Sequence, residues 1–307
     1  MALSCTVLVL LITSLSAYIR LSRAGLSCPD WPQCYGERLR QIQHGVPATA
    51  GDDDATAVAR LAHRVIASSA LLLVITMLVV CFAARPVRWA DGRVALALLA
   101  LLALALGLAV LGRWSSDARV PAVAIGNLLG GFAMLALCWR VARDGGAALP
   151  PRWRAGAIFA LLLIAVQVAL GGLVSASFAA TSCSGFGECL VSMRGVPWSA
   201  LDPWREPVLA GMPPVNASGA LAQALHRISG LAALAVVVPL ALAAWRHDRR
   251  TAGALLLALL ACTVALGIVM ASRGATLAVA LMHNLGAALL MATLLELSRA
   301  PRVASQS

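Results

Sequence analysis

The chain contains no lysine, so all 24 of its basic residues are arginine. Charge of either sign is scarce, since 12% of its 307 residues are charged and 61% are hydrophobic. A typical soluble domain carries about 25% charged residues, so this composition favours an integral membrane protein. The net charge of +11 does not indicate nucleic-acid binding, because the arginines are dispersed over short loops and form no basic stripe. We expect no nucleic-acid partner.

The hydrophobic residues gather in eight stretches, each close to the roughly 20 residues that a membrane-spanning helix needs. The first stretch lacks the positively charged segment that begins a secretory signal, so we interpret it as a helix. The expected fold is therefore all-α and crosses the lipid bilayer eight times. The expected spans are residues 2–19, 60–84, 94–112, 120–139, 155–178, 220–244, 252–272 and 275–297.

Two long polar segments, residues 20–59 and 179–219, follow the first and fifth spans, so they lie on one side of the membrane. Short arginine-rich loops face the cytoplasm. We therefore expect both termini in the cytoplasm and both long segments outside a bacterial inner membrane. The arginines that carry this prediction are Arg85, Arg88, Arg93, Arg140, Arg143, Arg152, Arg154, Arg246, Arg249, Arg250, Arg299 and Arg302.

The two halves of the chain repeat the same landmarks in the same order. AYIRLSRAGLSCPDWPQC at residues 17–34 matches GLVSASFAATSCSGFGEC at 172–189. LAHR at 61–64 then matches ALHR at 224–227, and NLLG at 127–130 matches HNLG at 283–286. Each half holds four spans. Residues 1–144 and 145–307 are therefore expected to form two pseudo-symmetric four-helix bundles, related by an axis along the membrane normal.

Three of the five histidines, His63, His226 and His283, fall within expected spans and in the outer half of the bilayer. Ionisable groups inside membrane helices are rare and indicate function. Neutral imidazoles at similar depth are typical of axial haem ligands. The alternative is a packed histidine that hydrogen-bonds to a neighbouring helix. A zinc site would require more ligands, so we favour haem, above all for His226 with His283.

Arg64 and Arg227 directly follow two of these histidines. A guanidinium matches a carboxylate well, so both arginines could pair with haem propionates. Contact with lipid phosphate is the alternative.

Four cysteines lie in the long segments, as the pairs Cys28 with Cys34 and Cys183 with Cys189. Each pair can close a short loop as a disulfide in an oxidising outer compartment. A structural role and a redox role both stay open, because exposed short-loop disulfides can be labile.

The GLSCPDWPQCYG segment at residues 25–36, the LAHR and ALHR helix starts and the HNLG run together resemble the haem A synthase family. The resemblance covers residues 18–297. It implies an oxidoreductase that converts haem O to haem A for cytochrome oxidase assembly. The C8 methyl of haem O would be hydroxylated twice, and loss of water would leave a formyl group. The resemblance also implies haem b as a cofactor. It implies two partners, haem O synthase and an electron donor in the membrane, and it allows a homo-oligomer.

The family carries two histidines in each half. The resemblance assigns His226 and His283 to the iron of haem b in a cofactor half, residues 145–307. It assigns His63 to the iron of substrate haem O in the half formed by residues 1–144. The cysteine pairs match those in the outer loops of some family members.

Two positions depart from the family pattern. Asn127 stands where the family has the fourth histidine, so His63 alone would hold haem O iron. Arg60 stands three residues before His63, where members often carry a glutamate, and the nearest acids are Asp52, Asp53 and Asp54. These departures put proton delivery in question.

Other functions fit parts of this pattern. A quinol-oxidising electron-transfer cytochrome would need two doubly ligated haems, and the sequence supplies one obvious pair. A non-catalytic haem-binding paralogue is favoured by Asn127 and Arg60. A transporter fits less well, because no span is broken near its middle.

Overall fold

A computed structural model describes residues 1–45, 54–83, 92–115, 119–143, 148–211 and 213–300. Within these residues, eight helices are long and apolar enough to cross a membrane. Each coincides with one predicted span, so the all-α, eight-span prediction is confirmed. They are α1 (Ala2–Arg23), α3 (Asp54–Ala83), α4 (Gly92–Ser115), α5 (Pro121–Ala142), α6 (Pro151–Ala176), α8 (Gly219–Arg246), α9 (Arg250–Arg273) and α10 (Leu277–Leu297).

Several helices extend beyond the predicted spans, because polar first and last turns add little to hydropathy. Pro121 and Pro151 begin α5 and α6 at positions where a missing backbone N–H costs no helical hydrogen bond. Asp54 lies in the first turn of α3, where a negative charge favours the helix dipole. Gly274 follows the last residue of α9, and its φ of 90° is a backbone conformation that favours glycine. Local sequence therefore accounts for the ends of these helices.

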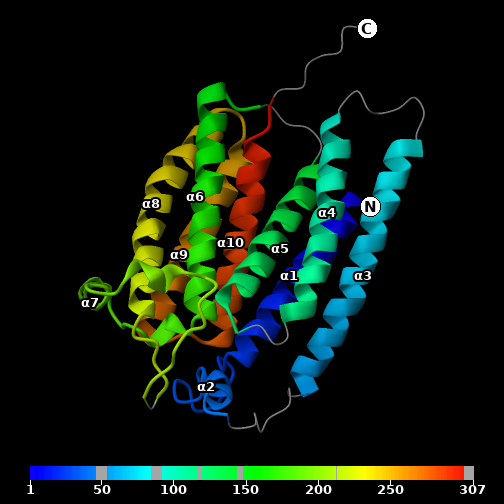
Figure 1. The fold of residues 1–307 in the computed structure, drawn as a ribbon. Helices are drawn as coiled ribbons and strands as arrows, with labels where there is room; N and C mark the ends of the chain where they lie inside the picture. The colour runs from blue at the N-terminus through cyan, green and yellow to red at the C-terminus, as the bar shows by residue number, and fades with distance from the viewer. Residues whose placement is uncertain (46–53, 84–91, 116–118, 144–147, 212, 301–307) are drawn as a thin grey trace.

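Each half forms a four-helix bundle with the same order of neighbours (Figure 1). In the first half α1 and α4 both pack on α3 and α5, so α3 and α5 occupy opposite corners. In the second half α6 and α9 both pack on α8 and α10, which again occupy opposite corners. The halves meet through α1, α5, α6 and α10. The pseudo-symmetry and the boundary at residue 144 stay predictions.

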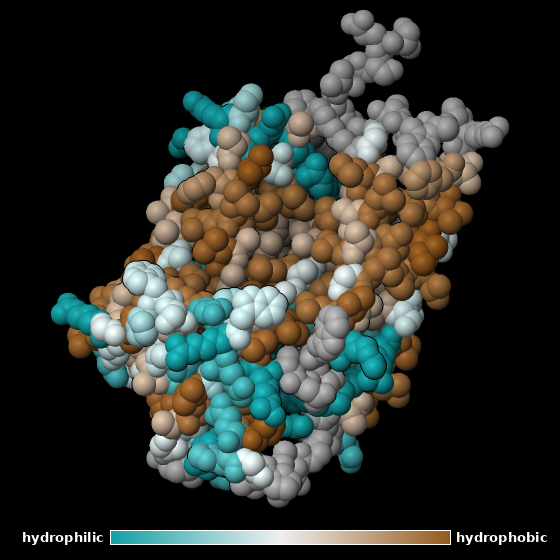
Figure 2. Space-filling model, in the orientation of Figure 1, coloured by the Kyte–Doolittle hydropathy of each residue, from teal (hydrophilic) through white to brown (hydrophobic). Residues whose placement is uncertain are grey.

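On the face drawn in Figure 2, hydrophobic side chains cover the helical part of the molecule, and hydrophilic ones gather toward its two ends. Leu72, Leu96 and Leu162 are 65%, 68% and 61% exposed. Such large apolar surfaces are unfavourable in water but suit contact with lipid. The interior between the helices is also apolar, with Phe132 and Leu256 fully buried. This distribution is that of an integral membrane protein.

The two long polar segments lie at the same end of the bundles, where Figure 1 shows α2 (Glu37–Gln43) and α7 (Phe186–Ser192). The second segment also holds two short 3-10 turns, η2 (Ala179–Thr181) and η3 (Trp198–Leu201). Which side of the membrane this end faces stays a prediction. Of the residues used above, Arg85, Arg88, Arg302, Asp52 and Asp53 lie outside the described part of the chain.

Each long segment crosses over to the other half. In the first segment, the ring of Trp31 packs so closely on Gly274 that a Cβ there would lie 2.6 Å from the ring. Gly274 joins α9 to α10 in the second half. In the second segment, the carbonyl of Pro203 accepts a hydrogen bond of 2.8 Å from the amide of Ala122 in α5. The loops therefore connect the bundles at this end.

Candidate functional site

The structure brings His226 of α8 and His283 of α10 together inside the second bundle. Their ring centroids are 6.4 Å apart and the ring planes are inclined by 66°. The two helices occupy opposite corners of the bundle, so the imidazoles meet across its interior. The sequence predicted this pairing from the positions of the histidines within the spans, the internal repeat and the family resemblance.

Backbone carbonyls hold the Nδ1 atom of each imidazole. His226 Nδ1 lies 3.1 Å from the carbonyl oxygen of Gln167 in α6. His283 Nδ1 lies 2.9 Å from the carbonyl oxygen of Thr263 in α9. A carbonyl can only accept, so each Nδ1 carries the hydrogen and donates. Nε2 of each ring keeps its lone pair, which is the tautomer that binds a metal.

Glycines make room for both rings one helical turn beyond these carbonyls. A Cβ on Gly171 would lie 2.9 Å from His226 Cε1, and a Cβ on Gly267 would lie 3.3 Å from His283 Cε1. Gly171 follows Gln167 by four residues, and Gly267 follows Thr263 by four. Each imidazole therefore bonds to a carbonyl of the neighbouring helix and lies against a notch, which is the space left by the glycine four residues further along that helix.

This arrangement fits axial ligation of haem iron. Two imidazole–metal bonds of about 2 Å place the ring centroids roughly 6 Å apart, close to the observed 6.4 Å. Within the described residues, no group of three or more histidine, cysteine, aspartate or glutamate side chains could hold a metal ion. A haem supplies four ligands to its own iron, so two imidazoles are enough to complete its coordination.

The first bundle holds the corresponding pair of positions. His63 lies on α3 and Asn127 on α5, at opposite corners, and both side chains are half-buried. Beside Asn127, α5 packs closely on α4, because a Cβ on Gly126 or Gly130 would lie within 3.0 Å of leucine side chains of α4. Whether His63 and Asn127 act together on one haem stays a prediction.

The two arginines expected near propionates lie toward the end that carries the long segments. Arg64 is exposed on α3. Arg227 is half-buried, and its Nη2 lies 3.4 Å from the carbonyl oxygen of Ser184. Arg227 is thus close to the second cysteine loop. Haem propionates and lipid phosphates both stay open as partners of the two arginines.

The two cysteines of each predicted pair lie within disulfide distance of each other. Cys28 and Cys34 have Cα atoms 6.5 Å apart, and Cys183 and Cys189 have Cα atoms 5.2 Å apart. Ser184 and Glu188 are hydrogen-bonded within the second loop, and the serine hydroxyl keeps the pKa of the Glu188 carboxyl below its usual range. The structural and redox roles of the disulfides stay open.

Sequence reasoning missed a polar contact between the halves. Arg20 lies in the last turns of α1, beyond the predicted span, and donates a hydrogen bond to the hydroxyl of Ser175 in α6. Tyr35 of the first long segment is fully buried nearby and packs edge-on against Phe178. Burial raises the pKa of Tyr35 well above its ordinary value. The signal available in the sequence was an arginine within reach of an apolar span.

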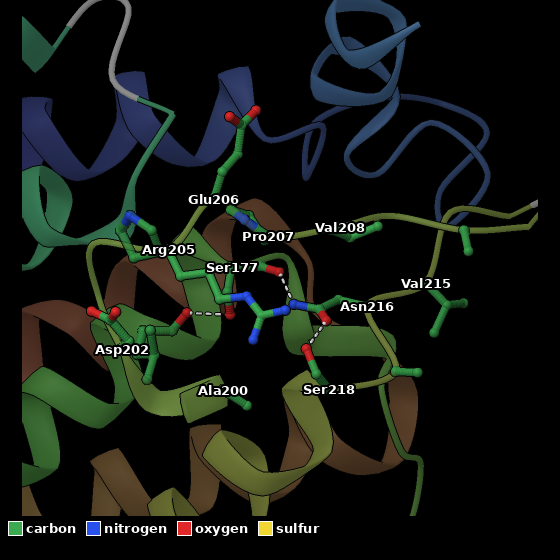
Figure 3. A pocket seen from close by; sticks show the side chains of 14 residues that line it. Ser177, Ala200, Asp202, Arg205, Glu206, Pro207, Val208, Val215, Asn216 and Ser218 are labelled. Atoms are coloured by element: carbon green, nitrogen blue, oxygen red, sulfur yellow. Dashed lines mark hydrogen bonds between the residues drawn. The ribbon is translucent and has the colours of Figure 1, made fainter. Parts of the chain in front are cut away.

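A cavity of about 300 Å³ lies where the second long segment covers the ends of α5 and α6 (Figure 3). Asn216 lies in one wall of the cavity. Its side-chain nitrogen donates a hydrogen bond of 2.7 Å to the carbonyl of Ser177, and its side-chain oxygen accepts one of 2.8 Å from the hydroxyl of Ser218. Arg205 extends into the cavity, whereas the carboxylate of Glu206 points away from it (Figure 3). Its described lining includes none of the site residues predicted from sequence.

Comparison with known proteins identifies the family of the chain. The chain is 30% identical to the Heme A synthase of Shewanella oneidensis, over 95% of this chain and 93% of that relative. Residues 1–295 match the COX15-CtaA family, described as "Cytochrome oxidase assembly protein". Together with eight spans and a histidine pair in the second bundle, the match over nearly the whole chain shows that this protein is a member of the COX15-CtaA family.

Proposed function

We propose that this protein is a haem A synthase of the bacterial inner membrane, an oxidoreductase that acts on haem O. The observation that carries the proposal is the pair His226 and His283, whose Nδ1 atoms are bound by carbonyls and whose Nε2 atoms are available for iron. Support comes from the family match and from the activity in the relative's name.

The second half is proposed as the cofactor half, and haem b bound there supplies electron transfer. His226 and His283 hold its iron, and the carbonyls of Gln167 and Thr263 keep both imidazoles in the metal-binding tautomer. Arg227, at the end that carries the long segments, would pair with a propionate.

The first half is proposed as the substrate half. His63 positions the iron of haem O, and Asn127 on the opposite corner leaves that iron with one protein ligand. An open coordination position is what oxidation at a haem requires. With molecular oxygen as the oxidant, each of two hydroxylations of the C8 methyl would insert one oxygen atom, consume two electrons and two protons from the donor and solvent, and release one water. The resulting geminal diol would lose a further water to leave the formyl group of haem A. Haem O synthase, an electron donor and a second copy of the chain stay predicted partners.

A second candidate function is a haem-binding paralogue without catalysis, and Asn127 and Arg60 favour it. The experiment that separates the two is expression with a source of haem O, followed by extraction of haems and mass analysis. Haem A is expected from the wild type and should be lost in His63→Ala. Haem O that persists unchanged in the wild-type cells would contradict the synthase and support the paralogue.

A further inference from the structure

Gln167 lies at the centre of a set of contacts between α6 and α8. Its backbone carbonyl accepts from His226 Nδ1 at 3.1 Å. The oxygen of its side chain accepts a hydrogen bond from the hydroxyl of Ser229. Its side-chain nitrogen would lie 3.3 Å from a Cβ on Gly230. One residue of α6 therefore contacts three residues on one face of α8.

The spacing of these three residues explains why they act together. Ser229 and Gly230 follow His226 by three and four residues, so all three lie on the same face of α8. Gly171, one turn further along α6, receives the ring of His226. Both contacts come from α6 and reach the Nδ1–Cε1 edge of the imidazole, so rotation about its side-chain bonds would break a hydrogen bond or collide with α6.

The first half keeps a backbone carbonyl at the position of Gln167 but lacks the two side chains that form the Gln167–Ser229 hydrogen bond. In the repeat, residues 17–34 match 172–189, which places Ile12 at the position of Gln167 and Ser16 at that of Gly171. The match of LAHR with ALHR places Ile66 at the position of Ser229. Isoleucine side chains form no hydrogen bonds, so His63 has no equivalent of the Gln167–Ser229 contact.

We infer that Gln167 and Ser229 are positioning residues that retain haem b by fixing His226, and that their replacement by Ile12 and Ile66 makes the first half a site from which haem exchanges. A ligand that is already fixed loses little conformational freedom when it binds iron, so it releases the haem slowly. The part about exchange rests on the proposed function, since a substrate half must release haem A in every turnover.

The test of retention uses the purified haem-loaded protein and an excess of apomyoglobin as haem acceptor. Gln167→Ile and Ser229→Ala are expected to speed the loss of haem b by about 10- to 100-fold, the range for partners that orient a metal ligand. Ser229→Thr keeps a hydroxyl and should restore slow loss. Ser272→Ala removes a hydroxyl that bonds within α9 and should match the wild type.

A second measurement distinguishes the positioning of His226 by Gln167 and Ser229 from a purely structural role of these two residues. Electron paramagnetic resonance reports the relative orientation of the two imidazole planes, and it should change in Gln167→Ile and Ser229→Ala but not in Ser229→Thr. Haem loss and spectra equal to the wild type in both Gln167→Ile and Ser229→Ala would overturn the positioning role. So would a Ser229→Thr variant that behaves like Ser229→Ala.

The reciprocal variant tests exchange. Ile12→Gln combined with Ile66→Ser introduces the two polar groups into the first half, and it should slow the release of added haem O to apomyoglobin about tenfold. Unchanged release of haem O would overturn the inference for that half. Neither assay depends on haem A formation, so failure of the wild type to make haem A would count against the proposed function and not against the positioning role.

Discussion

Replacement of Gly171 by alanine is the most direct test of how His226 is held. A Cβ at this position would lie 2.9 Å from His226 Cε1, where ordinary contacts begin at 3.4 Å, so the ring must move by about 0.5 Å. The movement stretches a hydrogen bond to Gln167 that is already 3.1 Å long, near the upper limit of about 3.2 Å for this bond type. Gly171→Ala should therefore weaken the binding of haem iron by His226.

The structure also provides a graded comparison. At Gly267 the corresponding Cβ would lie 3.3 Å from His283 Cε1, so that ring must move by only about 0.1 Å. Overpacking of this kind costs about 1–3 kcal/mol, which corresponds to roughly a 5- to 150-fold loss of affinity. Gly171→Ala should lie toward the upper end of that range, and Gly267→Ala should lie at or below its lower end.

The assay is the haem b content and low-spin spectrum of each purified variant, titrated with haem b to obtain an affinity. Gly107→Ala in α4 is the matched control, because a Cβ there meets nothing within 4 Å. Alanine favours a helix over glycine, so weaker binding in Gly171→Ala cannot come from a less stable helix. Equal affinities for Gly171→Ala, Gly267→Ala and the wild type would refute the proposed seating of the imidazoles.

Three further predictions concern other parts of the molecule. His283→Ala should abolish the six-coordinate haem b spectrum, and an unchanged spectrum would contradict the ligand assignment. Glu296 is buried and accepts hydrogen bonds from Trp139 at 2.7 Å and Arg249 at 2.6 Å. Loss of one partner of a buried ion pair costs about 3 kcal/mol or more, so Glu296→Gln should lower the Tm in detergent, whereas exposed Glu188→Gln should not. Gly274→Val should displace Trp31 and make the first long segment more sensitive to protease, a result that unchanged digestion would contradict.

The membrane fold could be predicted from sequence because hydropathy is a local property. Eight apolar stretches indicated eight helices, and the structure altered mainly their ends, as where α1 continues to Arg23 and brings Arg20 into contact with Ser175 of α6. The histidine pair could also be predicted, since an ionisable side chain within an apolar span is rare for a clear energetic reason. The internal repeat then indicated that His226 and His283 belong to one half.

Only the tertiary structure decided how those histidines are held. The groups that bind their Nδ1 atoms are backbone carbonyls, which every residue carries. The residue types at positions 167 and 263 therefore could not predict these contacts. The notches at Gly171 and Gly267 and the crossing of Trp31 onto the second half likewise depend on helix packing, which joins residues far apart in the chain. The sequence by itself determined the helices and the candidate ligands, because both follow from the polarity of individual side chains. The tertiary structure decided orientation and partners, because these depend on contacts across helices.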